Sequence, residues 1–172
     1  TANFRAGAGI FAETGNNLYS VTVTYGDSIP SPAVPERTGY KFTAWSPAVP
    51  SAMPAATQNF TAQWALESYT VKFVIDGNEI EQPYNFGEDI IAPDETETVK
   101  EGYTFKYWMD ANGNEVEIPA TMADIGADGS EVVYTAYFEI NSYTATWNNE
   151  DGSVYEGPTA YEFGAAVNKP AT

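Results

Sequence analysis

An internal repeat constrains this chain more than any other feature of its sequence. Residues 70–73 (TVKF) match residues 1–4 (TANF) and residues 144–147 (TATW). Further marks follow, among them an aromatic residue followed by glycine at Tyr25-Gly26, Phe86-Gly87 and Phe163-Gly164, and each of these marks has a proline at the same distance after it, Pro32, Pro93 and Pro170. Self-similarity at a period of about 70 residues indicates one small structural unit used several times in a row.

These marks divide the chain into three predicted copies. The first covers residues 1–66 and lacks about one residue at its start, the second covers 67–140, and the third, 141–172, holds only a first hairpin. A chain that begins and ends inside its own repeat is expected to be a piece of a longer protein. Leu66 and Ile140 occupy the same place in the two short joints, so we predict that they make an apolar contact between neighbouring copies.

The composition excludes several classes of function. The chain has no cysteine and no histidine, which removes thiol nucleophiles, Cys/His zinc sites and Ser-His-Asp triads. Seven basic residues against 24 acidic ones give a formal charge of −17, which repels nucleic acids and anionic membranes. No stretch approaches the roughly 20 apolar residues that cross a bilayer. We therefore expect no enzyme, no cofactor, no nucleic-acid partner and no membrane insertion.

Period-two alternation in the second copy predicts strands with one buried face. Tyr69, Val71, Phe73 and Ile75 fall on one face, and residues 76–78 (DGN) suit a tight hairpin turn. The predicted order in one copy is strand, hairpin, strand, short helix, strand, hairpin, strand, strand. In the first copy, the return strand is predicted through Val21, Val23 and Tyr25.

A short helix is predicted after Pro93. Asp94 is placed to cap it, Glu97 to complete a capping box, and Gly102 to end it in the left-handed conformation. Its counterpart in the first copy, residues 35–39, is shorter still. The predicted fold class is α+β, dominated by strands, with tandem small units and short or vestigial helices.

A bulge is predicted in the strand that follows this helix. Tyr103 and Phe105 share one strand face, whereas Trp108 has the opposite parity. Either both faces of this strand are covered, or a bulge near Tyr107 turns Trp108 inward. The same offset recurs at Trp45 in the first copy, which favours a shared bulge.

Taken together, the ordered marks resemble the internalin B-repeat family, also called Listeria-Bacteroides repeats. The residues that carry the resemblance are 69–73 (YTVKF), Phe86-Gly87 before Pro93, 101–105 (EGYTF) leading to Trp108, 60–64 (FTAQW) and 143–152 (YTATWNNEDG). The resemblance implies a β-grasp-like fold and tandem arrays in secreted or wall-anchored bacterial proteins, with roles in stalk building, adhesion or presentation of other domains. It implies no catalytic residues. Loops 6–17 and 123–130 depart from the family pattern.

Oxygen-bearing side chains at 110–114 offer a weak metal candidate. Asp110, Asn112 and Asn114 alternate as in a calcium loop, but the glycine comes at the fourth place rather than the sixth. A hairpin turn demands the same residue types.

Two function hypotheses follow. The first is a non-catalytic, semi-rigid spacer of an extracellular protein with an adhesive role. The alternative is a module that binds a glycan or a host protein through exposed aromatic residues or a sheet edge, with Tyr107 and Tyr137 as candidates because the first copy has Ala44 and Gln63 there. We expect a monomer, with pairing of the truncated third copy between chains as a route to an oligomer.

Overall fold

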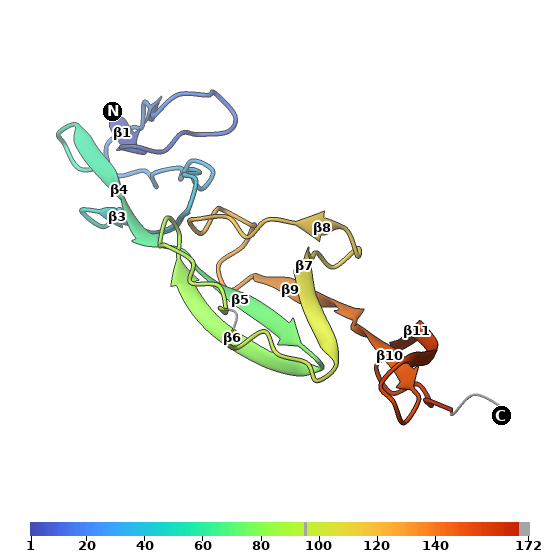
Figure 1. The fold of residues 1–172 in the computed structure, drawn as a ribbon. Coiled ribbons are helices and arrows are strands. Elements are labelled where there is room, and N and C mark those ends of the chain that lie inside the picture. Colours follow the sequence, from blue (N-terminus) through green and yellow to red (C-terminus); the bar gives the residue numbers. More distant parts are fainter. Residues whose placement is uncertain (95, 169–172) are drawn as a thin grey trace. The chain divides into compact units, whose positions relative to one another are not determined.

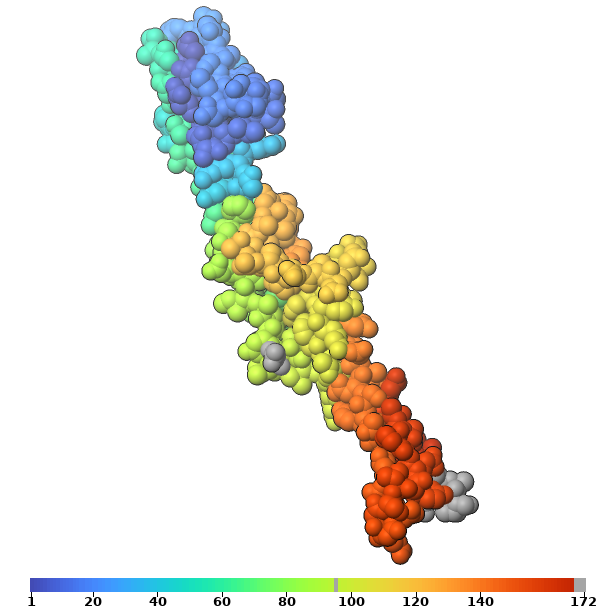
Figure 2. All heavy atoms as spheres, turned by 45° about the horizontal axis from the view of Figure 1, so that its top comes forward, coloured from blue at the N-terminus to red at the C-terminus, as the bar shows by residue number. Residues whose placement is uncertain are grey.

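The structure, a computed structural model, describes residues 1–94 and 96–168, which are the coloured parts of Figures 1 and 2. Strands are the regular secondary structure of these residues, and no helix occurs among them. No segment of the described chain is therefore a helix long and apolar enough to span a membrane. The chain forms two compact units, one comprising Thr1–Thr70, Pro83–Ile90 and Pro119–Val132, the other Val71–Gln82, Ile91–Ile118 and Val133–Thr172.

Four strands of the first copy form a mixed sheet. They are β1 (Ala2–Arg5), β2 (Leu18–Val21), β3 (Tyr40–Ser46) and β4 (Gln58–Leu66), in the order β2-β1-β4-β3. Strand β1 runs parallel to β4, while the β1-β2 and β3-β4 pairs are antiparallel.

The remaining strands form a five-stranded sheet and a separate hairpin (Figure 1). The sheet has the order β6-β5-β9-β7-β8, with β5 (Ser68–Ile75), β6 (Asn78–Asn85), β7 (Tyr103–Met109), β8 (Glu115–Val116) and β9 (Glu131–Ile140). The hairpin consists of β10 (Ser142–Asn148) and β11 (Val154–Glu162). Sheets of these small units need aromatic side chains to supply enough buried apolar area.

An aromatic trio recurs in the cores of the two larger sheets. Phe4 packs against Trp45 and Phe60, with ring centroids 5.0 and 4.9 Å away. The corresponding trio in the second copy is Phe73, Trp108 and Tyr134. As predicted, the side chains of β5 alternate, and Tyr69, Val71, Phe73 and Ile75 are buried.

The predicted bulge is confirmed in both copies. The register of β7 against β9 shifts between Phe105 and Tyr107, and that of β3 against β4 shifts between Phe42 and Ala44. The shift turns Trp108 into the core, where its ring lies 5.4 Å from that of Phe105. One extra residue thus brings side chains of opposite parity onto one face.

The predicted helix, and with it the α+β class, is wrong for the described residues. The local signal was sound: Asp94 N–H donates to Glu97 Oε2 at 3.0 Å, and Thr96 N–H donates to Asp94 Oδ1 at 2.7 Å. The chain nevertheless makes only a turn there, and Glu95 lies outside the described residues. Helix nucleation is unfavourable, and too few residues remain before Gly102 for propagation to compensate. Residues 35–39 likewise contain no helix.

The first return strand is shorter than predicted. β2 ends at Val21, where its pairing with β1 ends at Ala2, so Val23 and Tyr25 fall outside the strand. A strand persists only where its backbone groups find a partner. The predicted copy boundaries, 1–66, 67–140 and 141–172, remain a prediction.

Candidate interaction site at the repeat joints

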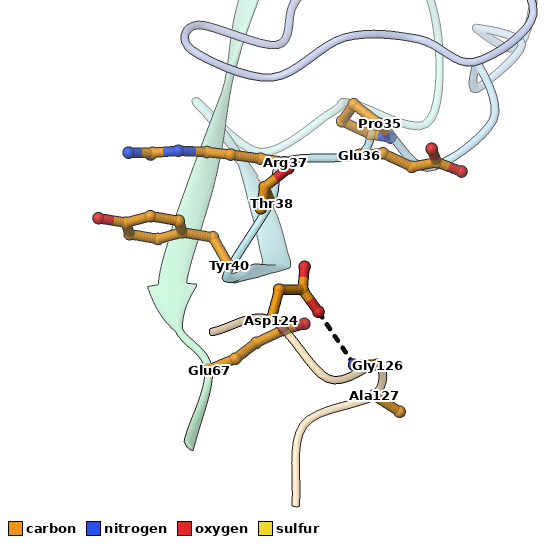
Figure 3. Close-up of a pocket in the computed structure, with 9 residues that line it drawn as sticks. All are labelled: Pro35, Glu36, Arg37, Thr38, Tyr40, Glu67, Asp124, Gly126 and Ala127. Atoms are coloured by element: carbon orange, nitrogen blue, oxygen red, sulfur yellow. Dashed lines mark hydrogen bonds between the residues drawn. The ribbon is translucent and has the colours of Figure 1, made fainter. Parts of the chain in front are cut away.

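A tight turn precedes β3, and its side chains form one side of the candidate site. Tyr40 N–H donates to the Arg37 carbonyl at 3.0 Å, and Gly39 sits at φ 71°, a conformation that glycine adopts without strain. The Arg37 guanidinium lies over the Tyr40 ring, 3.5 Å from its centroid (Figure 3). A guanidinium in this position is attracted by the ring's electron-rich face.

Phe86, which follows β6, covers this turn. A Cβ atom on Gly39 would lie less than 3.0 Å from the Phe86 ring, so only a glycine leaves room for it. The rings of Phe86 and Tyr40 meet edge to face at 6.4 Å. Two backbone hydrogen bonds of 3.0 Å complete the contact: Phe86 N–H donates to the Glu67 carbonyl, and Glu67 N–H donates to the Gly39 carbonyl.

The same arrangement recurs before β7. Gly102 has φ 75°, Lys100 Nζ lies 4.4 Å from the Tyr103 ring centroid, and Phe163 covers the turn with its ring 6.5 Å from that of Tyr103. Asn141 takes the place of Glu67 in this backbone relay: Phe163 N–H donates to the Asn141 carbonyl, and Asn141 N–H donates to the Gly102 carbonyl, both at 2.8 Å. We call residues 37–40 and 100–103 the socket turns, Phe86 and Phe163 the knobs, and each pairing a joint.

A loop between β8 and β9 reinforces the first joint. The Asp124 carboxylate accepts hydrogen bonds from Gly126 N–H at 3.0 Å, Gly39 N–H at 3.2 Å and the Tyr69 hydroxyl at 3.3 Å. The N–H donors of Gly126 and Gly39 hold the pKa of Asp124 below its ordinary value. The socket turn is thus stabilised by a hydrogen bond to Asp124, a residue far along the chain.

Asp128, in the same loop, accepts a second set of hydrogen bonds near the first joint. Its carboxylate accepts from Lys41 Nζ at 2.6 Å and from Ser68 N–H at 2.9 Å. The hydrogen bond from Lys41 lowers the pKa of Asp128. Gly129 N–H returns a bond of 2.7 Å to the Ser68 carbonyl.

Tyr69 is the buried member of this network. Its side chain is 1% exposed, and its hydroxyl donates to Glu67 Oε2 at 2.6 Å. Burial raises the pKa of Tyr69, and the hydrogen bond to Glu67 raises it further, because both disfavour the phenolate. The hydroxyl therefore stays protonated, and its single hydrogen is directed mainly to Glu67, with Asp124 at the longer distance of 3.3 Å.

A cavity of about 630 Å³ that is open to solvent lies at the first joint. Figure 3 shows its lining residues: Pro35, Glu36, Arg37, Thr38, Tyr40, Glu67, Asp124, Gly126 and Ala127. Two carboxylates of this lining, Glu67 and Asp124, already accept hydrogen bonds from the protein. The arrangement is suited to holding two segments of the chain together.

Comparison with known proteins decides the family. The profile of the Listeria-Bacteroides repeat domain matches residues 10–63 and again residues 69–126. The chain belongs to the Listeria-Bacteroides repeat family. The two matches fall on the first two of the three predicted copies.

Three relatives share the repeats. A "Putative Gly-rich membrane protein" of Evansella cellulosilytica is 28% identical over 78% of this chain, and a "Putative membrane protein" of the same organism is 27% identical over 91%. Internalin H of Listeria monocytogenes is 36% identical over 54% of this chain. The chain spans 18%, 24% and 18% of these relatives, respectively.

The two aromatic candidates of this Listeria-Bacteroides repeat protein lie together. Tyr107 and Tyr137 are direct partners across β7 and β9, and their rings stack with centroids 4.7 Å apart and planes 11° apart. The stack occupies one face of each ring, and Tyr137 is 41% exposed. A partly exposed tyrosine ring on a rigid strand pair is a suitable surface for another flat or apolar group.

The metal candidates lie together in the β7-β8 turn. Asp110 Oδ1 accepts the N–H groups of Asn112 at 2.8 Å and of Asn114 at 2.9 Å, and Asn114 Nδ2 donates to Asp110 Oδ2 at 3.1 Å. These bonds lower the pKa of Asp110, with the backbone N–H of Asn114 contributing most. In the described part of the chain, no three Asp or Glu residues gather as metal ligands.

The predicted contact residues Leu66 and Ile140 occupy equivalent strand positions, opposite Tyr40 and Tyr103. Leu66 is exposed and Ile140 is half-buried. Their contact with a neighbouring copy remains a prediction.

Sequence reasoning missed the joints themselves. The aromatic-glycine and glycine-tyrosine marks were visible, and so was a basic residue three places before each tyrosine, but nothing in the spacing shows that the two marks meet. The roles of Asp124 and Asp128 had no sequence signal beyond their place in an atypical loop.

Proposed function

We propose that this chain is a non-catalytic spacer region of a bacterial surface protein, in which consecutive repeats are held in series by knob-and-socket joints. The observation that supports the proposal is the recurrence of one joint at two places. Phe86 on Gly39 and Phe163 on Gly102 share the aromatic geometry, the cation over the tyrosine and the backbone relay. A contact repeated in each copy limits bending between copies, which is what a semi-rigid spacer requires.

Family membership supports the cellular setting that we propose. The resemblance to internalin B repeats implies a secreted or wall-anchored protein, and two relatives carry names that refer to a membrane. An acidic surface with a formal charge of −17 favours solubility for an exposed, extended array.

Small-angle scattering of the whole chain tests the spacer proposal. We expect the wild-type profile to fit a narrow distribution of end-to-end distances, and Gly39→Ala to broaden it by expelling Phe86. Gly15→Ala is the matched control, because Gly15 has φ 67° but nothing within 4 Å of an added Cβ. A wild-type profile that fits freely jointed units would refute the proposal.

A binding role is the second candidate, and the Tyr107-Tyr137 stack favours it. We propose that the exposed face of Tyr137 receives a sugar ring or an apolar group of a host protein. A glycan and matrix-protein array probed with the chain and with a Tyr107→Ala, Tyr137→Ala double variant tests this role. Tyr143→Ala removes a tyrosine elsewhere that is 54% exposed, against 41% for Tyr137, and is the control. Binding that survives the double variant would exclude the stack as the site.

We also propose that each full repeat is a reduced β-grasp-like unit. The support is the mixed sheet of the first copy, where β1 runs parallel to β4 at its centre. An experimental structure with antiparallel central strands would contradict this assignment.

A further inference from the structure

Tyr25 is followed by the same kind of turn that follows the knob Phe86. Gly26 N–H donates to the Met53 carbonyl at 3.0 Å, just as Gly87 N–H donates to the Met122 carbonyl at 2.7 Å. The two glycines have φ 86° and 79°, and both methionines are buried. The turn that follows Tyr25 therefore shares its backbone hydrogen bond and its glycine conformation with the turn that follows Phe86.

Exposure distinguishes Tyr25 from the two knobs. Phe86 is half-buried and Phe163 is 40% exposed, whereas Tyr25 is 76% exposed. The strands before the knobs, β6 and β11, continue to Asn85 and Glu162, while β2 ends four residues before Tyr25. The first copy thus has the turn that follows a knob. Its strand does not extend to the aromatic residue, however, and the Tyr25 side chain is not covered by a socket turn.

We propose that Tyr25 and its turn form a docking surface for the socket turn of a further repeat placed before the first copy. Both socket turns of this chain already hold a knob, so the fitting occupant is an additional repeat rather than a second copy of this chain. Phe163 stays 40% exposed on its socket turn, so an aromatic residue in this position remains partly accessible to solvent. This inference rests on the proposed spacer function and specifies its partner.

A fusion places an additional socket turn before residue 1 of this chain. Residues 70–143 are placed directly before Thr1, so that the added Gly102 stands one repeat ahead of Tyr25 and as far before Thr1 as Gly102 stands before Thr144 in the chain. Amide hydrogen exchange by nuclear magnetic resonance then compares Tyr25 in the fused and unfused chains. Seating should give Tyr25 N–H a carbonyl partner and slow its exchange by at least about tenfold.

Two variants in the added repeat isolate the socket. Gly102→Ala there should abolish the protection of Tyr25, because its Cβ would occupy the space of the ring. Gly113→Ala, at a similar φ of 82° but with nothing near an added Cβ, should leave the protection intact.

Unchanged exchange of Tyr25 in the fusion would overturn the inference, as would protection that both variants leave intact. Protection in the unfused chain that rises with protein concentration would also overturn it, because the occupant would then be a second copy. The amides of Phe86 and Phe163 in the unfused chain report separately on the joints of the proposed spacer. Their rapid exchange would reject that function, whereas their protection with an unprotected Tyr25 rejects only the docking surface.

Discussion

The ring of Phe86 occupies the space that a side chain on Gly39 would need. Gly39 therefore meets two demands at once, since it also holds a positive φ that other residues rarely adopt. Gly102 meets the same two demands beneath Phe163. The joints thus depend on glycine for space as well as for backbone conformation.

Gly39→Ala should destabilise the chain more than Gly15→Ala. Both alanines would stand at positive φ, a strain of about 1 kcal/mol each. Only the first also collides with an aromatic ring, which adds about 1–3 kcal/mol of overpacking. Urea unfolding followed by circular dichroism measures the difference, and equal free energies for the two variants would show that Phe86 does not press on Gly39.

Tyr69→Phe should cost about 1.5–3 kcal/mol at neutral pH, the range for hydrogen bonds to charged groups. The variant keeps the buried ring and removes the donor to Glu67 and Asp124. Because the pKa of Tyr69 is raised on folding, this contribution is complete below the ordinary pKa near 10 and falls as the pH rises above it. Tyr137→Phe is the control, and equal free energies of unfolding for the two variants would exclude the network.

Asp124→Asn should make the free energy of unfolding less dependent on pH in the acid range. Folding lowers the pKa of Asp124, so its stabilising contribution is present above the unfolded value of about 3.9 and is lost as the pH falls through the folded value. Unfolding free energies at several pH values between neutral and strongly acid should converge for the two proteins at the acid end. Glu13→Gln removes one exposed charge from the same unit, and an identical profile from that control would show a general charge effect.

A double-mutant cycle on Tyr107 and Tyr137 should give a coupling of about 0.5–1.5 kcal/mol, as expected for stacked aromatic rings. The four free energies of unfolding, from wild type, each alanine variant and the double variant, define this coupling. A coupling near zero would mean that the two rings do not stack in solution.

Calcium should leave the melting temperature of the chain unchanged. The carboxylate of Asp110 already accepts hydrogen bonds from Asn112 and Asn114, and a cation would have to displace them. Thermal melts with calcium and with a chelator measure the effect, beside the Asp110→Asn variant. A rise in melting temperature that is absent from the variant would establish a calcium site.

Local signals predicted much of the fold. The alternation in β5, the hairpin after Ile75 and the bulge before Trp108 follow from patterns within a few residues, and all three are present. The helix after Asp94 also had a sound local signal, and Glu97 accepts the Asp94 N–H as in a capping box. It failed because a cap lowers only the cost of starting a helix, while the length that sustains one was missing.

The candidate site was less predictable. Tyr107 and Tyr137 were chosen because the first copy lacks them, and their stacking was not foreseen. The joint at Gly39 was not predicted, because Phe86 and Asp124 reach it from distant parts of the chain.

The sequence by itself determined the repeat, its strands, its turns and the positions of its glycines, since these depend on periodicity and on backbone preferences of single residues. Only the tertiary structure decided that the knob of one copy seats on the socket turn of the copy before it, and that the atypical loop of the second copy fastens the first joint. Such contacts depend on the three-dimensional paths of several segments, and short-range patterns carry no information about which distant surfaces come together.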